Sequence, residues 1–95
     1  MKNDYDITEE ERKKTIKKYL NQDGSIIQFP AKQKGKIIIL GEIVNKFSAE
    51  IHYSEVEINT ILKTIYHDYS YIRRLLVEYG FLERTDSGSE YWIKE

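Results

Sequence analysis

The clearest pattern of hydrophobic and polar positions lies in the second half of the chain, between Tyr53 and Trp92. Two runs of apolar residues there recur every three or four positions, the spacing of one face of a helix. The first run is Ile58, Ile61, Leu62 and Ile65, and the second is Ile72, Leu75, Leu76 and Tyr79. The pattern predicts two consecutive amphipathic helices, over residues 54–66 and 68–79.

Polar residues at the ends of these runs fix the expected boundaries. Ser54 and Glu57 have the spacing of a capping box, in which each side chain accepts a hydrogen bond from the other residue's amide. Asp68 can cap the second helix after a tight turn at His67, and Gly80 can adopt the left-handed conformation that ends it. The order helix, tight turn, helix is typical of a helix-turn-helix motif.

A β-hairpin is expected after the second helix. Phe81–Arg84 and Tyr91–Ile93 are strand-like, and the Thr85–Glu90 segment between them contains the Asp and Gly that a hairpin turn requires. We expect this hairpin, residues 81–93, to form a wing, backed by a short strand at residues 51–53.

Two further helices are predicted in the first half. Thr8 and Glu11 form a second capping box at the start of a helix over residues 7–20, whose apolar stripe is thin. After a turn at Asp23-Gly24, residues 25–29 resemble a short strand, and Pro30 suits the first turn of a helix. That helix, residues 31–47, carries a helical apolar repeat, and Gly41 would allow a close approach by a neighbouring helix.

These elements predict one α+β, mainly helical domain over residues 1–95. Three core helices with a C-terminal β-hairpin wing would form a winged helix-turn-helix-like fold, and the helix at residues 7–20 would be an N-terminal addition. A chain of 95 residues is too short for two hydrophobic cores.

Composition limits the possible function classes. The chain has no cysteine, which excludes disulfides, thiolate metal sites and cysteine nucleophiles. No apolar run approaches the roughly 20 residues of a membrane span, and the charged start lacks a signal-peptide core. Nucleophile elbows, phosphate loops and histidines at metal-ligand spacing are also lacking. We therefore expect a cytoplasmic protein without membrane contact, catalysis, metal or cofactor.

Charge is uneven along the chain, although the formal net charge is only -1. Residues 1–36 carry nine Lys and Arg against six Asp and Glu, whereas residues 68–95 carry four against six. Because non-specific DNA affinity comes mainly from neutralising phosphates, the half with the predicted recognition helix is less basic than DNA binding favours.

The outer face of the helix at residues 68–79 holds the main candidate contacts. At 100° per residue, Ser70, Arg74 and Val77 lie opposite its core stripe, with Tyr71 and Arg73 on the flanks. A guanidinium can bind guanine or clamp phosphate. Alternatively, Arg74 pairs with Glu78, or one arginine ties the helix to Asp86 or Glu90 in the wing.

Other polar residues have both structural and functional interpretations. Lys32, Lys34 and Lys36 could bind phosphate at the start of the core helix, or they could simply be solvated. Asn59 is expected to hydrogen-bond the turn near His67. Val77 on an outer face could meet a thymine methyl or a partner protein.

Several spaced residues carry a resemblance to a known family. They are Asp23-Gly24, Phe29-Pro30, Lys32, Ile39-Leu40, Phe47, Tyr53-Ser54-Glu55, Glu57, Asn59, Asp68, Arg73-Arg74, Leu76-Val77, Gly80, Leu82, Arg84, Gly88-Ser89 and Tyr91-Trp92. With these residues the chain resembles, over roughly Tyr19–Ile93, the small prokaryotic domain of unknown function 2087. Members of that family occur alone or attached to helix-turn-helix regions of transcriptional regulators, so the resemblance implies a winged-helix-like domain linked with transcription.

Two functions follow as expectations. The first is a transcriptional regulator that binds double-stranded DNA through the helix at residues 68–79 and the wing, as a homodimer if binding is specific. The alternative is a protein-interaction or dimerisation module of winged-helix shape with no DNA affinity of its own, joined to itself or to a regulator partner.

Overall fold

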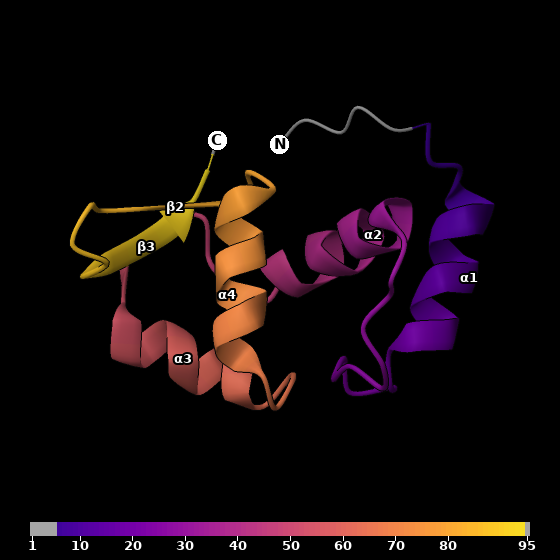
Figure 1. The fold of residues 1–95 in the computed structure, drawn as a ribbon, viewed down its shortest axis with the longest axis horizontal. Helices are drawn as coiled ribbons and strands as arrows, with labels where there is room; N and C mark the ends of the chain where they lie inside the picture. The colour runs from indigo at the N-terminus through magenta and orange to yellow at the C-terminus, as the bar shows by residue number, and fades with distance from the viewer. Residues whose placement is uncertain (1–5, 95) are drawn as a thin grey trace.

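The computed structural model describes residues 6–94 and has four helices and one small antiparallel sheet (Figure 1). In chain order the elements are α1 (Glu9–Tyr19), α2 (Gln33–Val44), β1 (Tyr53–Ser54), α3 (Glu55–Lys63), α4 (Tyr69–Glu78), β2 (Leu82–Arg84) and β3 (Glu90–Ile93). The predicted α+β, mainly helical fold class is confirmed. Residues 1–5 and 95 of the expected domain lie outside the described part of the chain.

The capping residues chosen from the sequence start the helices in the structure. In both capping boxes the side chain of the third helical residue, Glu11 or Glu57, accepts from the backbone amide of the cap, at 3.1 Å from Thr8 and 2.8 Å from Ser54. Asp68 accepts from the Tyr71 amide at 3.4 Å and caps α4. These local hydrogen bonds satisfy amide groups that a helix start leaves without partners.

The sheet has the strand order β1-β3-β2, so the C-terminal strand lies in the middle. Tyr53 pairs with Tyr91 across β1 and β3, and Arg84 pairs with Tyr91 across β2 and β3. The first strand is thus residues 53–54 rather than 51–53. Ser54 ends it because the same residue is already the N-cap of α3.

Three other predicted elements differ from the structure by three residues or more. Residues 25–29 form one isolated bridge instead of a strand, because the Ile26 amide donates to Ile65 and the Ile27 amide to Tyr19, which belong to different segments. Helix α2 begins at Gln33, so Pro30 lies before it, and ends at Val44 rather than residue 47. Helix α3 ends at Lys63, three residues early, and a turn follows.

The hydrophobic core lies between α2, α3, α4 and the sheet. Its most completely buried side chains are Ile39, Leu40, Ile43, Ile58, Leu62, Ile72, Leu76, Phe81 and Leu82. Helix α1 has no buried residue and lies at the opposite end of the molecule from the sheet (Figure 1). The core therefore fixes α4 and the hairpin firmly against each other, whereas α1 is attached at the side of α2.

Candidate nucleic-acid interface

A groove of about 530 Å³ separates α4 from the hairpin. Three arginines, Arg73, Arg74 and Arg84, line it together with two carboxylates, Glu55 and Glu78. The remaining lining residues are Ser70, Val77, Ser87, Gly88 and Tyr91. The groove therefore lies between the outer face of α4 and the β2–β3 hairpin, the segment expected to form a wing, and we call it the α4–wing groove. Its charged side chains carry a small positive excess.

Arg73 is held in place by neighbours from two elements. Its Nη1 donates to the Asn59 side-chain oxygen and lies 4.0 Å from a carboxylate oxygen of Glu55, both on α3. The guanidinium also lies over the Tyr91 ring, 5.8 Å from its centroid, and the side chain is only 20% exposed. Asn59 thus has a structural role, as expected, but its partner is Arg73 rather than the turn near His67 and Asp68.

Arg74 is much more exposed than Arg73, at 63% of its side chain. Its Nε lies 3.9 Å from Glu78, as one of the structural interpretations expected, and its guanidinium lies over the Tyr71 ring at 5.5 Å. An exposed ion pair of this kind contributes about 1 kcal/mol or less. An anion with better geometry can therefore take the guanidinium from Glu78.

Arg84 joins the wing to the groove. Its Nη1 donates to the backbone oxygens of Thr85 at 3.2 Å and Asp86 at 3.3 Å. The expected tie from an α4 arginine to Asp86 or Glu90 is not made: Arg73 and Arg74 pair with Glu55 and Glu78, and the Arg84 contacts stay within the hairpin. The sequence could have indicated the position of Arg84, because side chains in a strand alternate between its two faces. Arg84 therefore lies on the same face of the hairpin as Tyr91, and Glu83 lies on the other face.

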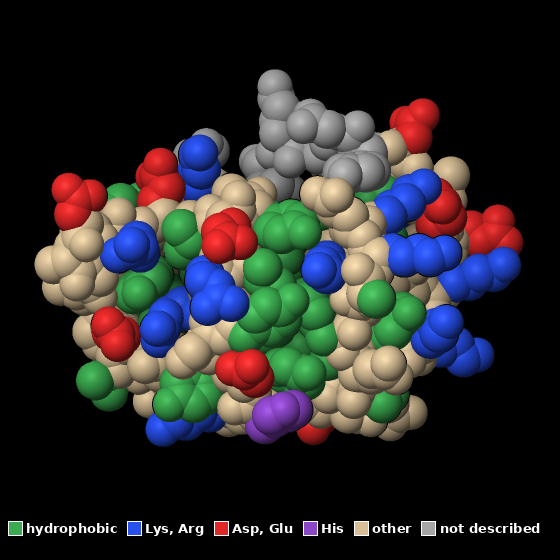
Figure 2. Space-filling view, in the orientation of Figure 1, with side chains coloured by type: hydrophobic (Ala, Val, Ile, Leu, Met, Phe, Trp, Pro, Cys, Tyr) green, Lys and Arg blue, Asp and Glu red, His purple; other side chains and the backbone are tan. Residues whose placement is uncertain are grey.

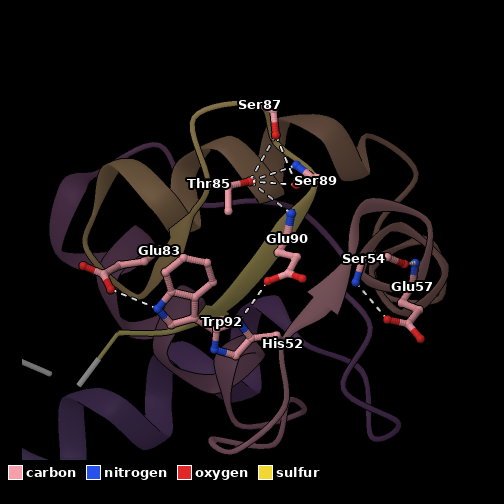
Figure 3. Close-up of polar contacts among 9 residues, drawn as sticks. All are labelled: His52, Ser54, Glu57, Glu83, Thr85, Ser87, Ser89, Glu90 and Trp92. Atoms are coloured by element: carbon pink, nitrogen blue, oxygen red, sulfur yellow. Dashed lines mark hydrogen bonds and ion pairs between the residues drawn. The ribbon is translucent and has the colours of Figure 1, made fainter.

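Hydroxyl groups order the loop of the wing. The Thr85 hydroxyl accepts from the amides of Ser89 at 3.0 Å and Glu90 at 3.2 Å, and also contacts the Ser87 and Ser89 hydroxyls (Figure 3). Gly88 has φ +77°, a conformation that glycine adopts without steric cost. The loop therefore presents Ser87 to the groove in a defined geometry.

The other side of the hairpin is occupied by its own contacts. His52 stacks on Trp92, with ring centroids 4.6 Å apart, and its Nδ1 lies 3.1 Å from Glu90 (Figure 3). Trp92 donates from its ring nitrogen to Glu83 at 3.0 Å. These contacts cover one face of the Trp92 ring and use its ring nitrogen, and the arginines lie on the groove side of the hairpin, which is therefore the better candidate interface.

The structure brings only part of the predicted residue set together. Ser70, Arg73, Arg74 and Val77 line the groove, whereas Tyr71 packs edge-on against Phe29 at 5.8 Å. Val77 is half-buried against the core, which corrects the expectation that it is exposed.

The three predicted lysines all lie outside the groove. Lys32 and Lys34 line a separate hollow beside α1, and Lys36 lies in the first turns of α2 and does not line the α4–wing groove. Lys34 pairs with Glu11 at 2.9 Å and, as the largest cause, lowers the pKa of that carboxyl below its usual value. These three lysines therefore do not belong to the α4–wing site.

One face of the molecule displays basic side chains at both ends (Figure 2). Lys and Arg side chains lie over α4 and the hairpin on one side and over α1 on the other, interspersed with Asp and Glu at both ends, and most of the hydrophobic side chains lie between them (Figures 1 and 2). Among residues 6–94, no group of three or more His, Asp and Glu side chains is arranged to hold a metal ion. Within the same residues, no helix is long and apolar enough to cross a membrane.

Comparison with known proteins finds one similarity. A family model described as "Uncharacterized protein conserved in bacteria (DUF2087)" matches residues 25–93, which include α2, α3, α4 and the sheet. No curated protein and no solved structure matches the chain. Several residues that carry the family resemblance, Glu55, Asn59, Arg73, Arg74, Arg84, Gly88 and Tyr91, lie around the α4–wing groove or position its arginines.

Proposed function

The chain belongs to the DUF2087 family of bacterial proteins, and because the family description names no activity, we propose a function from the α4–wing groove. We propose that the domain is a winged helix-turn-helix that binds double-stranded DNA and acts as a transcriptional regulator. Helices α3 and α4 form the helix-turn-helix, α4 is the recognition helix, and β2 and β3 form the wing.

The observation that carries this proposal is the convergence of three arginines on one groove. Two of them are already positioned, Arg73 by Asn59 and Glu55, and Arg84 by the carbonyls of the wing loop. Positioned guanidinium groups lose less conformational entropy when they bind an anion. A guanidinium also matches the planar geometry of a phosphate oxygen pair.

The arrangement suits a duplex lying along α4. The helix has ten residues and is therefore roughly 15 Å long, and a single helix fits the major groove, which is about 12 Å wide. Ser70 on the exposed face would meet base edges. Arg73, Arg74 and Arg84 would hold phosphates at the edge of the groove, while the loop carrying Ser87 lies over the backbone.

The charge of the groove sets the expected strength of binding. With all three arginines on phosphates, the slope of log affinity against log salt is about -2.7, so a fourfold rise in salt weakens binding about 40-fold. Few phosphate contacts per domain also mean weak binding by a single copy. Specific recognition would therefore use a dimer on a two-fold site.

The test is a fluorescence anisotropy titration against a labelled mixed-sequence duplex at 50 and 200 mM KCl. Arg74→Ala is the informative variant because Arg74 is exposed and has little structural role, and its slope should fall in magnitude to about 1.8. Lys13→Ala is the matched control, since Lys13 is an exposed cation on α1 outside both the groove and the hollow. Failure of the unmodified protein to bind at 50 mM, or equal losses in both variants, would contradict the proposal.

A protein-interaction module remains the second candidate. The half-buried Val77 does not support this candidate. Val56, which is 74% exposed, and Ile51, which is 46% exposed, support it instead. Val56 lies on α3 and Ile51 shortly before β1. Exposed aliphatic side chains of this kind favour contact between copies of the chain or with a partner.

A further inference from the structure

A second concave site lies between α1 and the start of α2, at the opposite end of the molecule from the wing. Its volume is about 460 Å³, within the range of roughly 300–1,000 Å³ typical of small-molecule sites. Its floor includes Tyr19, Pro30 and Ile38, of which Pro30 and Ile38 are buried. The lining of the hollow therefore includes an apolar part, made by residues of α1, of α2 and of the segment before α2.

The hollow exists because α1 has too few apolar residues to close against α2. None of its side chains is buried, and contacts between α1 and α2 include ion pairs such as Lys34 with Glu11. The helix therefore lies beside α2 without filling the space above Pro30 and Ile38. A ligand with an apolar body could complete this packing.

Charge around the opening selects the sign of that ligand. Four lysines line the hollow, Lys14, Lys18, Lys32 and Lys34, and they face one carboxylate, Glu11. Glu11 is paired with Lys34. Lys14 lies 3.9 Å from the exposed Glu10, and the Lys18 ammonium lies over the Tyr19 ring at 5.3 Å. The hollow thus keeps a positive excess beside an apolar surface.

We propose that this hollow binds a small organic anion with an apolar body, such as an aromatic or aliphatic carboxylate or sulfonate. The apolar part packs between α1 and the Pro30 and Ile38 surface, and the anionic group is held by Lys18 and Lys32. Nucleic-acid phosphate alone would use the lysines but leave the apolar floor empty. The proposal does not depend on DNA binding, because the hollow and the α4–wing groove share no residue.

The probe is 1-anilinonaphthalene-8-sulfonate, an aromatic sulfonate whose fluorescence rises in apolar sites. We expect saturable binding of one molecule per chain, together with a rise in melting temperature, because a ligand of the folded state stabilises that state. N-phenyl-1-naphthylamine, which has the same rings without the sulfonate, should bind markedly less tightly. The melting readout separates binding to the folded hollow from binding to unfolded chain.

The decisive variant is Lys18→Glu with Lys32→Glu, two exposed lysines of the rim that leave the Lys34 pair with Glu11 intact. Its matched control is Lys13→Glu with Lys17→Glu, which changes the net charge of the protein by the same amount. Both control residues lie on α1 outside the hollow. We expect at least about tenfold weaker sulfonate binding in the rim variant and less than a twofold change in the control.

A blocking variant and a competition with duplex DNA test the proposal further. Ala31→Trp places a large side chain at the edge of the hollow and should block the probe while the far-ultraviolet circular dichroism spectrum is unchanged. Equal losses in the rim variant and its control, or binding that never saturates, would overturn the proposal. Displacement of the probe by duplex DNA would assign the lysines to nucleic acid and overturn it as well.

Discussion

Gly35 and Gly41 lie on the same helix, α2, but a methyl group at each would meet different neighbours. At Gly41 the nearest atom of another residue is Cε1 of Phe81, 3.6 Å away, which is ordinary van der Waals contact. At Gly35 the nearest is Cβ of Pro30, only 2.9 Å away. Replacement of each glycine by alanine should therefore change stability in opposite directions.

The two effects can be estimated separately. In a helix interior, alanine is favoured over glycine by about 0.5–1 kcal/mol, and Gly41 has no steric penalty to set against that gain. Gly35 lies in the first turn, where the gain is smaller, and the rigid ring of Pro30 cannot move aside. Overpacking of this kind costs about 1–3 kcal/mol, so Gly35→Ala should be destabilised by roughly 1–2 kcal/mol.

Thermal and urea unfolding of the two variants measure the difference. At about 4–8 °C per kcal/mol for a domain of this size, Gly41→Ala should melt about 2–8 °C above the unmodified protein and Gly35→Ala below it. A Gly35→Ala protein as stable as Gly41→Ala would refute the close packing of Pro30 on α2. A lower melting temperature for Gly41→Ala would show that Phe81 leaves no room for a methyl group at this position.

Two further predictions concern α1 and the exposed aliphatic residues. Lys34 and the Thr8 amide lower the pKa of Glu11 in the folded protein, so the stabilising effect of Glu11 is present at neutral pH and is lost as the pH falls below its usual value of 4.5. The melting temperature of Glu11→Gln should therefore lie below that of the unmodified protein at pH 7, and the difference should shrink as the pH falls below 4.5. A difference that stays constant with pH would contradict the assignment. If Val56 joins two copies of the chain, light scattering should detect a dimer that Val56→Asp converts to monomer, and an unchanged mass would count against that surface.

Local signals predicted most of the fold. The capping boxes at Thr8 and Ser54 depend on residues only three positions apart, and the apolar stripes of α3 and α4 follow from helical spacing. Such patterns can be detected from sequence because the interacting groups are neighbours along the chain. The prediction of a strand at residues 25–29 was wrong because the Ile26 amide donates to Ile65 and the Ile27 amide to Tyr19. Residue spacing along the sequence cannot reveal such partners.

The site was predicted less completely, for the same reason. The outer face of α4 can be located by counting residues, but the link from Arg73 to Asn59 joins two helices and needs their packing. Arg84 was overlooked because strand alternation indicates its side of the hairpin, whereas only the packing of the hairpin beside α4 brings that side to the groove. Lys32 and Lys34 were DNA-contact candidates because of their charge, whereas the start of α2 lies beside α1, at the opposite end of the molecule from the hairpin (Figure 1).

The most direct test of DNA binding through the α4–wing groove is a nuclear magnetic resonance titration of ¹⁵N-labelled protein with a mixed-sequence duplex at low salt. We predict that the amide and guanidinium signals that move most belong to the serines and arginines that line the groove, Ser70, Arg73, Arg74, Arg84 and Ser87. If the signals of these residues do not move, or if only signals around Val56 and Ile51 move, DNA binding through the α4–wing groove is contradicted.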